Sequence, residues 1–146
     1  MRKKFASQKG ASLVEFALIL ILLIVITFGI IEFGMLIYNK QVITNASREG
    51  ARAGIVASLP RVSDAGIDSV VQNYCANHLV TFGAQNDPVT TVTGYSPTAL
   101  LGSDLQVAVA YNYHFLILPN FLPGIDELLD DDKLFNIQAV TVMRYE

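Results

Sequence analysis

The longest uninterrupted apolar run of the chain lies close to its N-terminus. From Phe16 to Ile31 no residue is charged, and Thr27 is the only polar side chain. A helix needs about 20 residues to span a bilayer, and extending the run to Ala11 and Tyr38 supplies that length. The pattern predicts a membrane-spanning helix whose membrane part covers about residues 13–38.

Two carboxylates mark the ends of this apolar run. Glu15 precedes it and Glu32 follows it. At a rise of about 1.5 Å per residue they lie about 25 Å apart, near opposite edges of a hydrocarbon core about 30 Å thick. Ionisable residues at such depths are costly and commonly functional. Glu15 is a candidate functional residue, unless it merely lies at the headgroup boundary, and Glu32 is either interfacial or paired within an assembly.

A short basic segment, residues 1–10, precedes the apolar run. It holds four of the ten basic residues of the chain, Arg2, Lys3, Lys4 and Lys9. Positive charge stays on the cytoplasmic side of a membrane, so the helix is expected to run N-in and C-out. A leader cut after Gly10 would start the mature chain at Ala11 and put Glu15 at its fifth position. This combination is typical of type IV prepilin leaders and makes Gly10 and Ala11 the expected processing site.

Two other fates of the N-terminus stay open. A secretory signal peptide also combines basic residues with an apolar run, but the small-x-small cleavage site that should follow is missing after Gly29. The other possibility is a membrane anchor that is never cut.

Beyond the membrane the helical pattern continues until Pro60, so a stem helix is expected over residues 11–59. Small residues recur there at intervals of four: Ala46, Gly50, Gly54 and Ser58. On a helix they share one face and allow another backbone to approach closely. Each glycine costs about 1 kcal/mol of helix propensity relative to alanine, so close packing should compensate. The stripe is either a packing seam between subunits or a contact with the protein's own sheet, and we favour the second.

Residues 60–146 are enough for one small domain. A second helix is expected from about Asp64 to Leu79, capped by Ser63 or Asp64. Its apolar face would consist of Ile67, Val70, Val71, Tyr74, Cys75 and His78. Cys75 is the only cysteine and is expected to be a buried, small apolar residue. His78 is expected to be a partly buried helix residue.

Three segments read as β-strands because their residues are β-branched or alternate between apolar and polar. They are residues 88–93, 105–117 and 135–145. On the second segment Tyr111 and Tyr113 share the apolar face and are expected in the core. The prediction is an α+β fold, in which a three- or four-stranded antiparallel sheet lies against the outer half of the long helix.

The sequence offers little catalytic chemistry. It lacks nucleotide-binding glycine motifs, nucleophile elbows, zinc-protease motifs and cysteine pairs, so an enzyme is not expected, nor a cofactor or a metal site. The acidic run Asp126–Asp132 suits calcium in composition, but it lacks the glycine and spacing of an EF-hand loop, and a solvated loop is favoured. Thirteen acidic residues outnumber the basic ones, which argues against a nucleic-acid partner.

Three motifs of the N-terminal third resemble the TadE-like family of minor pilins and pseudopilins of the Tad/Flp tight-adherence pilus. They are VEFAL at Val14 to Leu18, GIIEFG at Gly29 to Gly34 and NASREGAR at Asn45 to Arg52. Relatives often carry a proline within the apolar run, where this chain reads Leu20-Ile21-Leu22. Because proline is the usual cause of a sharp kink, the stem is expected to be straighter here.

The resemblance implies a function in pilus biogenesis and surface adhesion. A prepilin peptidase would cut the leader, and the Ala11 ammonium of one subunit would pair with Glu15 of its neighbour. The implied partners are other pilins, the prepilin peptidase, the inner-membrane assembly platform and membrane lipid. The protein would cross the inner membrane once, with its mature domain periplasmic or extracellular. The alternative is an unprocessed, membrane-anchored accessory protein whose domain binds partners of a secretion or pilus machine.

Overall fold

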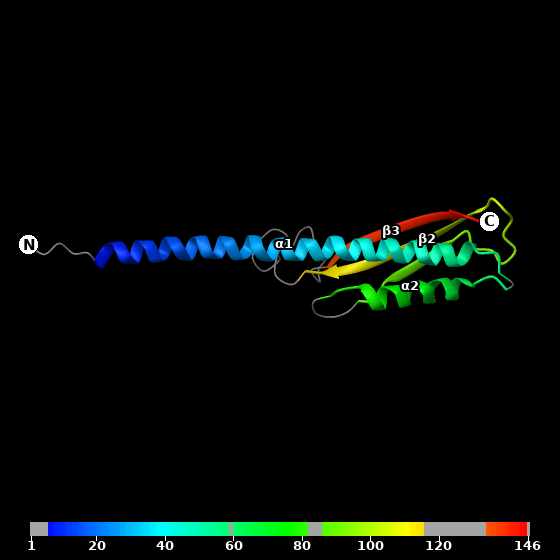
Figure 1. Cartoon of the computed structure of the whole chain (residues 1–146), viewed down its shortest axis with the longest axis horizontal. Helices are drawn as coiled ribbons and strands as arrows, with labels where there is room; N and C mark the ends of the chain where they lie inside the picture. The colour runs from blue at the N-terminus through cyan, green and yellow to red at the C-terminus, as the bar shows by residue number, and fades with distance from the viewer. Residues whose placement is uncertain (1–5, 59, 82–85, 116–133, 146) are drawn as a thin grey trace, which may run out of the picture.

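The structure is a computed structural model that describes residues 6–58, 60–81, 86–115 and 134–145. Its elements, in chain order, are α1 (Ala6–Ile55), α2 (Asp64–His78), β1 (Val89–Thr93), β2 (Asp104–His114) and β3 (Leu134–Arg144). Figure 1 shows α1 as a rod whose N-terminal half projects freely, while its C-terminal half carries α2 and the sheet. The predicted α+β fold, with a long apolar helix, a second helix and an antiparallel sheet, is confirmed.

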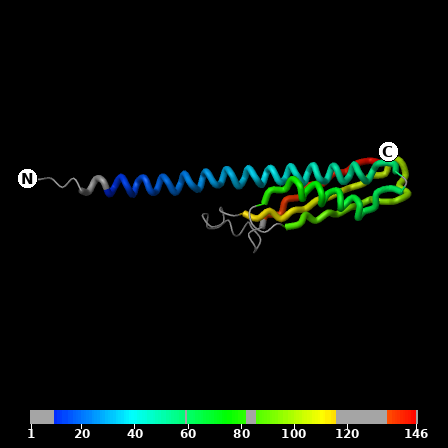
Figure 2. Tube along the Cα trace, turned by 60° about the horizontal axis from the view of Figure 1, so that its bottom comes forward, coloured from blue at the N-terminus to red at the C-terminus, as the bar shows by residue number. Residues whose placement is uncertain are grey.

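Helix α1 contains no proline and runs without interruption through the Gly10–Ala11 junction. Figures 1 and 2 show it without a sharp kink, as expected for an apolar run that lacks proline. It ends at Ile55 rather than at residue 59, and Ser58 donates a backbone hydrogen bond to the Val56 carbonyl (2.9 Å) in the turn that follows. The helix therefore stops one turn before the proline from which its end was predicted.

The N-terminal part of α1 is long and apolar enough to cross a membrane. From Leu13 to Ile31 its large apolar side chains are exposed, apart from the half-buried Val25. In water such a surface would be strongly unfavourable. From Gly10 onward, the first buried residue is Glu32, from which point the rest of the protein covers one side of α1.

The sheet has the order β1-β2-β3, and both pairings are antiparallel. Strand β2 alternates as predicted, with one face buried: Leu105, Val107, Val109, Tyr111 and Tyr113. The other face of β2 points away from the helices, alongside the exposed Val140 and Val142 of β3. Residues 116 and 117, placed at the end of this strand by the sequence, lie outside the described residues.

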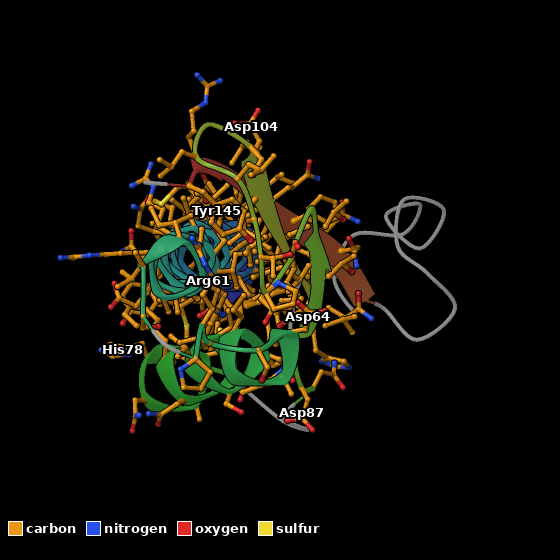
Figure 3. The ribbon with its side chains drawn as sticks, turned by 90° about the vertical axis from the view of Figure 1, so that its right-hand side faces the viewer. Arg61, Asp64, His78, Asp87, Asp104 and Tyr145 are labelled. Atoms are coloured by element: carbon orange, nitrogen blue, oxygen red, sulfur yellow. The ribbon has the colours of Figure 1, made fainter. Side chains whose placement is uncertain are left out.

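The helices form a second layer over the buried face of the sheet. Helix α1 contacts β2 and β3, whereas α2 packs beside α1 and also contacts β1. Figure 3, a view along α1 from its C-terminal end, shows α2 next to α1 with the sheet across both. At this far end Arg61 lies over the ring of Tyr145, 4.8 Å from its centroid. We call α2 and the sheet together the head.

Helix α2 begins as predicted, because the Ser63 hydroxyl accepts a hydrogen bond from the Gly66 amide (3.2 Å). Of its predicted apolar face, Ile67, Val71 and Cys75 are buried. The placement of His78 is wrong: this residue is exposed and stacks on Tyr74 with ring centroids 4.4 Å apart. It lies in the last turn of α2 beside the buried face of the helix, on the side of Tyr74 and not among Ile67, Val71 and Cys75.

Candidate assembly and membrane site

The predicted processing site and Glu15 lie on the free part of α1. A Cβ added to Gly10 would meet nothing within 4 Å, so the helix surface is open there. Ala11 and Glu15 are exposed and stand one helical turn apart. No hydrogen bond or ion pair joins the Glu15 carboxylate to the rest of the described chain. An acceptor on an open apolar surface is thus available to a second molecule.

Glu32, the second acid of the apolar segment, is placed differently. It is only 3% exposed and faces the head. Its backbone carbonyl accepts a hydrogen bond from the Tyr113 hydroxyl (3.5 Å). Burial, followed by the nearby charge of Glu32, raises the pKa of Tyr113 to about 12. The structure therefore turns Glu32 toward its own domain, which leaves Glu15 as the exposed carboxylate of the apolar stem.

The stripe of small residues packs inside the protein. Ala46, Gly50 and Gly54 are buried, and a Cβ at Gly50 would lie 2.6 Å from Cγ2 of Val71 on α2. At Gly54 it would lie 2.5 Å from Cδ2 of Leu105 on β2. Ser58 lies beyond the end of α1 and donates a hydrogen bond to the Pro60 carbonyl (3.1 Å). The first three positions of the stripe thus bring α1 close to α2 and the sheet of the same chain, the alternative that the sequence favoured.

A buried asparagine that the sequence did not single out joins α1 to the segment that follows α2. The Asn39 side chain is fully buried; its Nδ2 donates to the Val80 carbonyl (2.7 Å) and its Oδ1 accepts from the Val80 amide (3.0 Å). Both backbone groups of a residue just past α2 are thereby satisfied. Leaving buried groups of this kind unpaired costs about 1–3 kcal/mol. The available signal was a polar residue at helical spacing from the apolar residues Val42 and Ala46.

Cys75 lies in the core between α2 and the sheet and is fully buried. Burial raises the pKa of its thiol to about 11. The thiolate, which is the reactive form, is therefore scarce near neutral pH. The prediction of a buried, small apolar residue is confirmed.

Cys75 in the native protein is expected to resist a maleimide reagent at about pH 8, because neither the reagent nor water reaches a thiol held protonated by burial. Denaturation in urea should make labelling complete within minutes, as mass spectrometry can show. The matched control is Ala76→Cys in a Cys75→Ala background, since residue 76 is the exposed neighbour on the same helix. Equal labelling rates for the two native proteins would contradict the buried position.

The described residues bring together no group of three or more His, Cys, Asp or Glu side chains that could hold a metal ion. The acidic run Asp126–Asp132, considered for calcium, lies outside them. The features that the structure presents are the exposed apolar stem with its carboxylate Glu15 and, further along α1, the head packed on the outer half of the helix.

A free apolar helix with a small α+β head on its outer half defines a stem-and-head protein whose long helix is apolar enough to cross a membrane. The family model described as TadE-like protein matches residues 10–52 of this chain. The resemblance is confirmed over that segment, which includes Glu15, Glu32 and most of α1. Searches of curated proteins and of solved structures gave no match. The family match suggests a protein associated with a Tad pilus.

Proposed function

We propose that this protein is a minor pilin or pseudopilin of a Tad-type pilus, made as a precursor and cut by a prepilin peptidase between Gly10 and Ala11. The observation that carries the proposal is the exposed Glu15 on a stem whose other acid, Glu32, is buried against the head. An exposed carboxylate on an apolar helix is costly unless a partner compensates it. The TadE-like match begins at Gly10, the last residue of the proposed leader.

In the proposed mechanism, cleavage creates an ammonium group at Ala11, one turn before Glu15 on the same open surface. The two groups of one helix do not pair with each other. The Ala11 ammonium of one subunit pairs with Glu15 of the neighbouring subunit. Each pair offsets part of the desolvation cost of both charges and sets the axial register of adjacent stems. The partners are other pilins and the inner-membrane assembly platform, and the head faces the periplasm or the cell exterior.

The size of the head favours a minor subunit, because major Flp-type pilins consist of little more than a stem. In this proposal the protein primes or joins a pilus used in surface attachment and has no catalytic role. The alternative is an anchor that keeps its leader and whose head binds partners of a secretion or pilus machine. The fate of residues 1–10 separates the two functions.

Mass spectrometry of the protein from cells with and without prepilin peptidase tests the proposal directly. We expect the chain to start at Ala11 only when the peptidase is present. Gly10→Val should prevent the cut, whereas Gly34→Val serves as the control, since both glycines are helical and neither has an atom within 4 Å of the added Cβ. A chain that starts at Met1 or Arg2 in both strains would contradict processing and favour the anchored alternative.

A further inference from the structure

Four aromatic rings form a cluster centred on Phe115, at the end of the head nearest the exposed apolar part of α1. Phe33 of α1 contacts Phe115 (centroids 6.2 Å apart), which also contacts Tyr113 (5.2 Å) and Phe135 of β3 (6.3 Å). The two inner rings, Tyr113 and Phe115, are buried, whereas Phe33 is 51% and Phe135 40% exposed. We call these four residues the aromatic foot. Its outer members present apolar surface where the free stem begins.

The length of the exposed apolar part of α1 sets the depth at which the aromatic foot would lie in a membrane. The exposed apolar side chains extend from Leu13 to Ile31, which is about 28 Å at 1.5 Å per residue. That length nearly fills a hydrocarbon core about 30 Å thick, and the headgroup layers extend the bilayer to about 40–45 Å. If the stem spans the membrane, Phe33 therefore lies at the edge of the hydrocarbon core, and the residues from there to about Tyr38 fall in the headgroup layer, with Lys40 at its outer edge.

The exposed side chains of α1 beside the aromatic foot are of the types that favour the headgroup layer of a membrane. Because Glu32 is turned inward, the first charge on the outside of α1 after the apolar run is Lys40. Between them Ile37 is 67% and Tyr38 47% exposed. Tyrosine at a membrane interface places its ring among apolar groups and its hydroxyl in water, and lysine reaches from an apolar surface toward phosphate.

A groove of about 350 Å³ adjoins the foot, between α1 and β3. Leu36, Ile37 and Phe135 provide its apolar walls, and Lys40, Asn136 and Gln138 line it as well. Lys40 has no carboxylate partner among the described residues. An apolar channel beside a cation that has no carboxylate partner among the described residues is complementary to a phospholipid, which has apolar chains below an anionic phosphate. The apolar stem of another copy would supply no anion at this level, because its Glu32 is buried.

We propose that the aromatic foot and the adjoining groove bind phospholipid of the leaflet at the C-terminal end of the span, with Lys40 on the phosphate. This inference rests on the proposed membrane insertion of the stem and goes beyond it, because it gives the head a lipid contact of its own. The contact fixes the height and tilt of the head on the membrane before assembly. Entry into a pilus then requires that lipid be exchanged for neighbouring subunits.

Tryptophan fluorescence tests the contact, since the natural chain contains no tryptophan. The full chain carrying Phe135→Trp is reconstituted in vesicles of equal parts phosphatidylcholine and phosphatidylglycerol, with or without brominated acyl chains. We expect several-fold stronger quenching than for Val142→Trp, an exposed position near the far end of the same strand. Tyr38→Trp provides a second measurement of quenching beside the aromatic foot. Resistance of Cys75 to maleimide confirms that each variant is folded.

Phe16→Trp, in the exposed stem, separates failure of this inference from failure of membrane insertion. Quenching at residue 16 without quenching at residues 38 and 135 would overturn the lipid contact and leave the anchor intact. No quenching at any of the three would overturn both. A blue-shifted but unquenched Phe135→Trp would indicate a protein neighbour in the groove and would also overturn the proposal.

The role of Lys40 is tested in the Phe135→Trp background. Quenching should increase when phosphatidylglycerol is added to phosphatidylcholine, and Lys40→Gln is expected to abolish that increase. Gln41→Ala, at an exposed neighbouring position on α1, should retain it. An increase that survives in Lys40→Gln would show that the phosphate is not held by Lys40.

Discussion

A Glu15→Ala variant is expected to be cut after Gly10 and to insert in the membrane, yet to fall out of the pilus fraction almost completely. In the proposed assembly this substitution leaves the Ala11 ammonium of a neighbour without its partner in an apolar bundle. Removing one partner of a buried ion pair costs about 3–5 kcal/mol, and each 1.4 kcal/mol is a factor of ten. Incorporation should therefore fall by about 100-fold or more, as immunoblots of sheared pili and of membranes would show.

The matched control for Glu15→Ala is Glu49→Ala, which removes an exposed carboxylate from the outer part of the same helix. It should leave incorporation of the protein into pili unchanged, because position 49 lies beyond the apolar run that ends at Ile31. Membrane insertion of Glu15→Ala should be equal to that of the natural chain or better, since a costly charge is lost. Normal incorporation and normal piliation in Glu15→Ala would count strongly against the pilin function and favour the anchored accessory protein.

Gly50→Leu is expected to destabilise the head by about 3 kcal/mol, the upper end of the range for overpacked cores. Even its Cβ would lie 2.6 Å from Cγ2 of Val71 and 3.4 Å from Cγ2 of Ile67. Both neighbours are β-branched and stiff at χ1, so they cannot turn aside easily. The gain of about 1 kcal/mol in helix propensity does not compensate. Urea unfolding of the full chain in detergent, followed by the reactivity of Cys75, measures the loss.

Gly34→Leu is the control for the change at Gly50. The glycine it replaces also lies within α1, but nothing stands within 4 Å of an added Cβ there. Leucine should be neutral or slightly stabilising at this position, because only the propensity gain remains. Equal urea midpoints for the two variants would show that the close approach of α1 to α2 at Gly50 does not limit the packing of the head.

Local patterns were enough to predict the elements of this protein. The helix α1, the capped start of α2 and the alternation of β2 all follow from periodicities and residue preferences within short windows. The apolar run likewise indicates a span by length and composition alone. Glu15 could be singled out for the same reason, since a carboxylate beside such a run needs no tertiary information to be recognised. The end of α1 was predicted about one turn too late, because several residues before Pro60 are compatible with either a helix or a turn.

Long-range contacts decided the rest. Whether the stripe at Gly50 and Gly54 faces another subunit or the chain's own head depends on where α2 and β2 pack, and the helical period cannot tell two such partners apart. Glu32 and Glu15 look alike in sequence, but only the head, built from residues far along the chain, buries the first and leaves the second exposed. The hydrogen bond of Asn39 and the ring contacts of the aromatic foot likewise join residues that are distant in sequence. The sequence by itself thus determined the elements and the apolar helix that is able to span a membrane, whereas the tertiary structure decided which polar groups remain exposed.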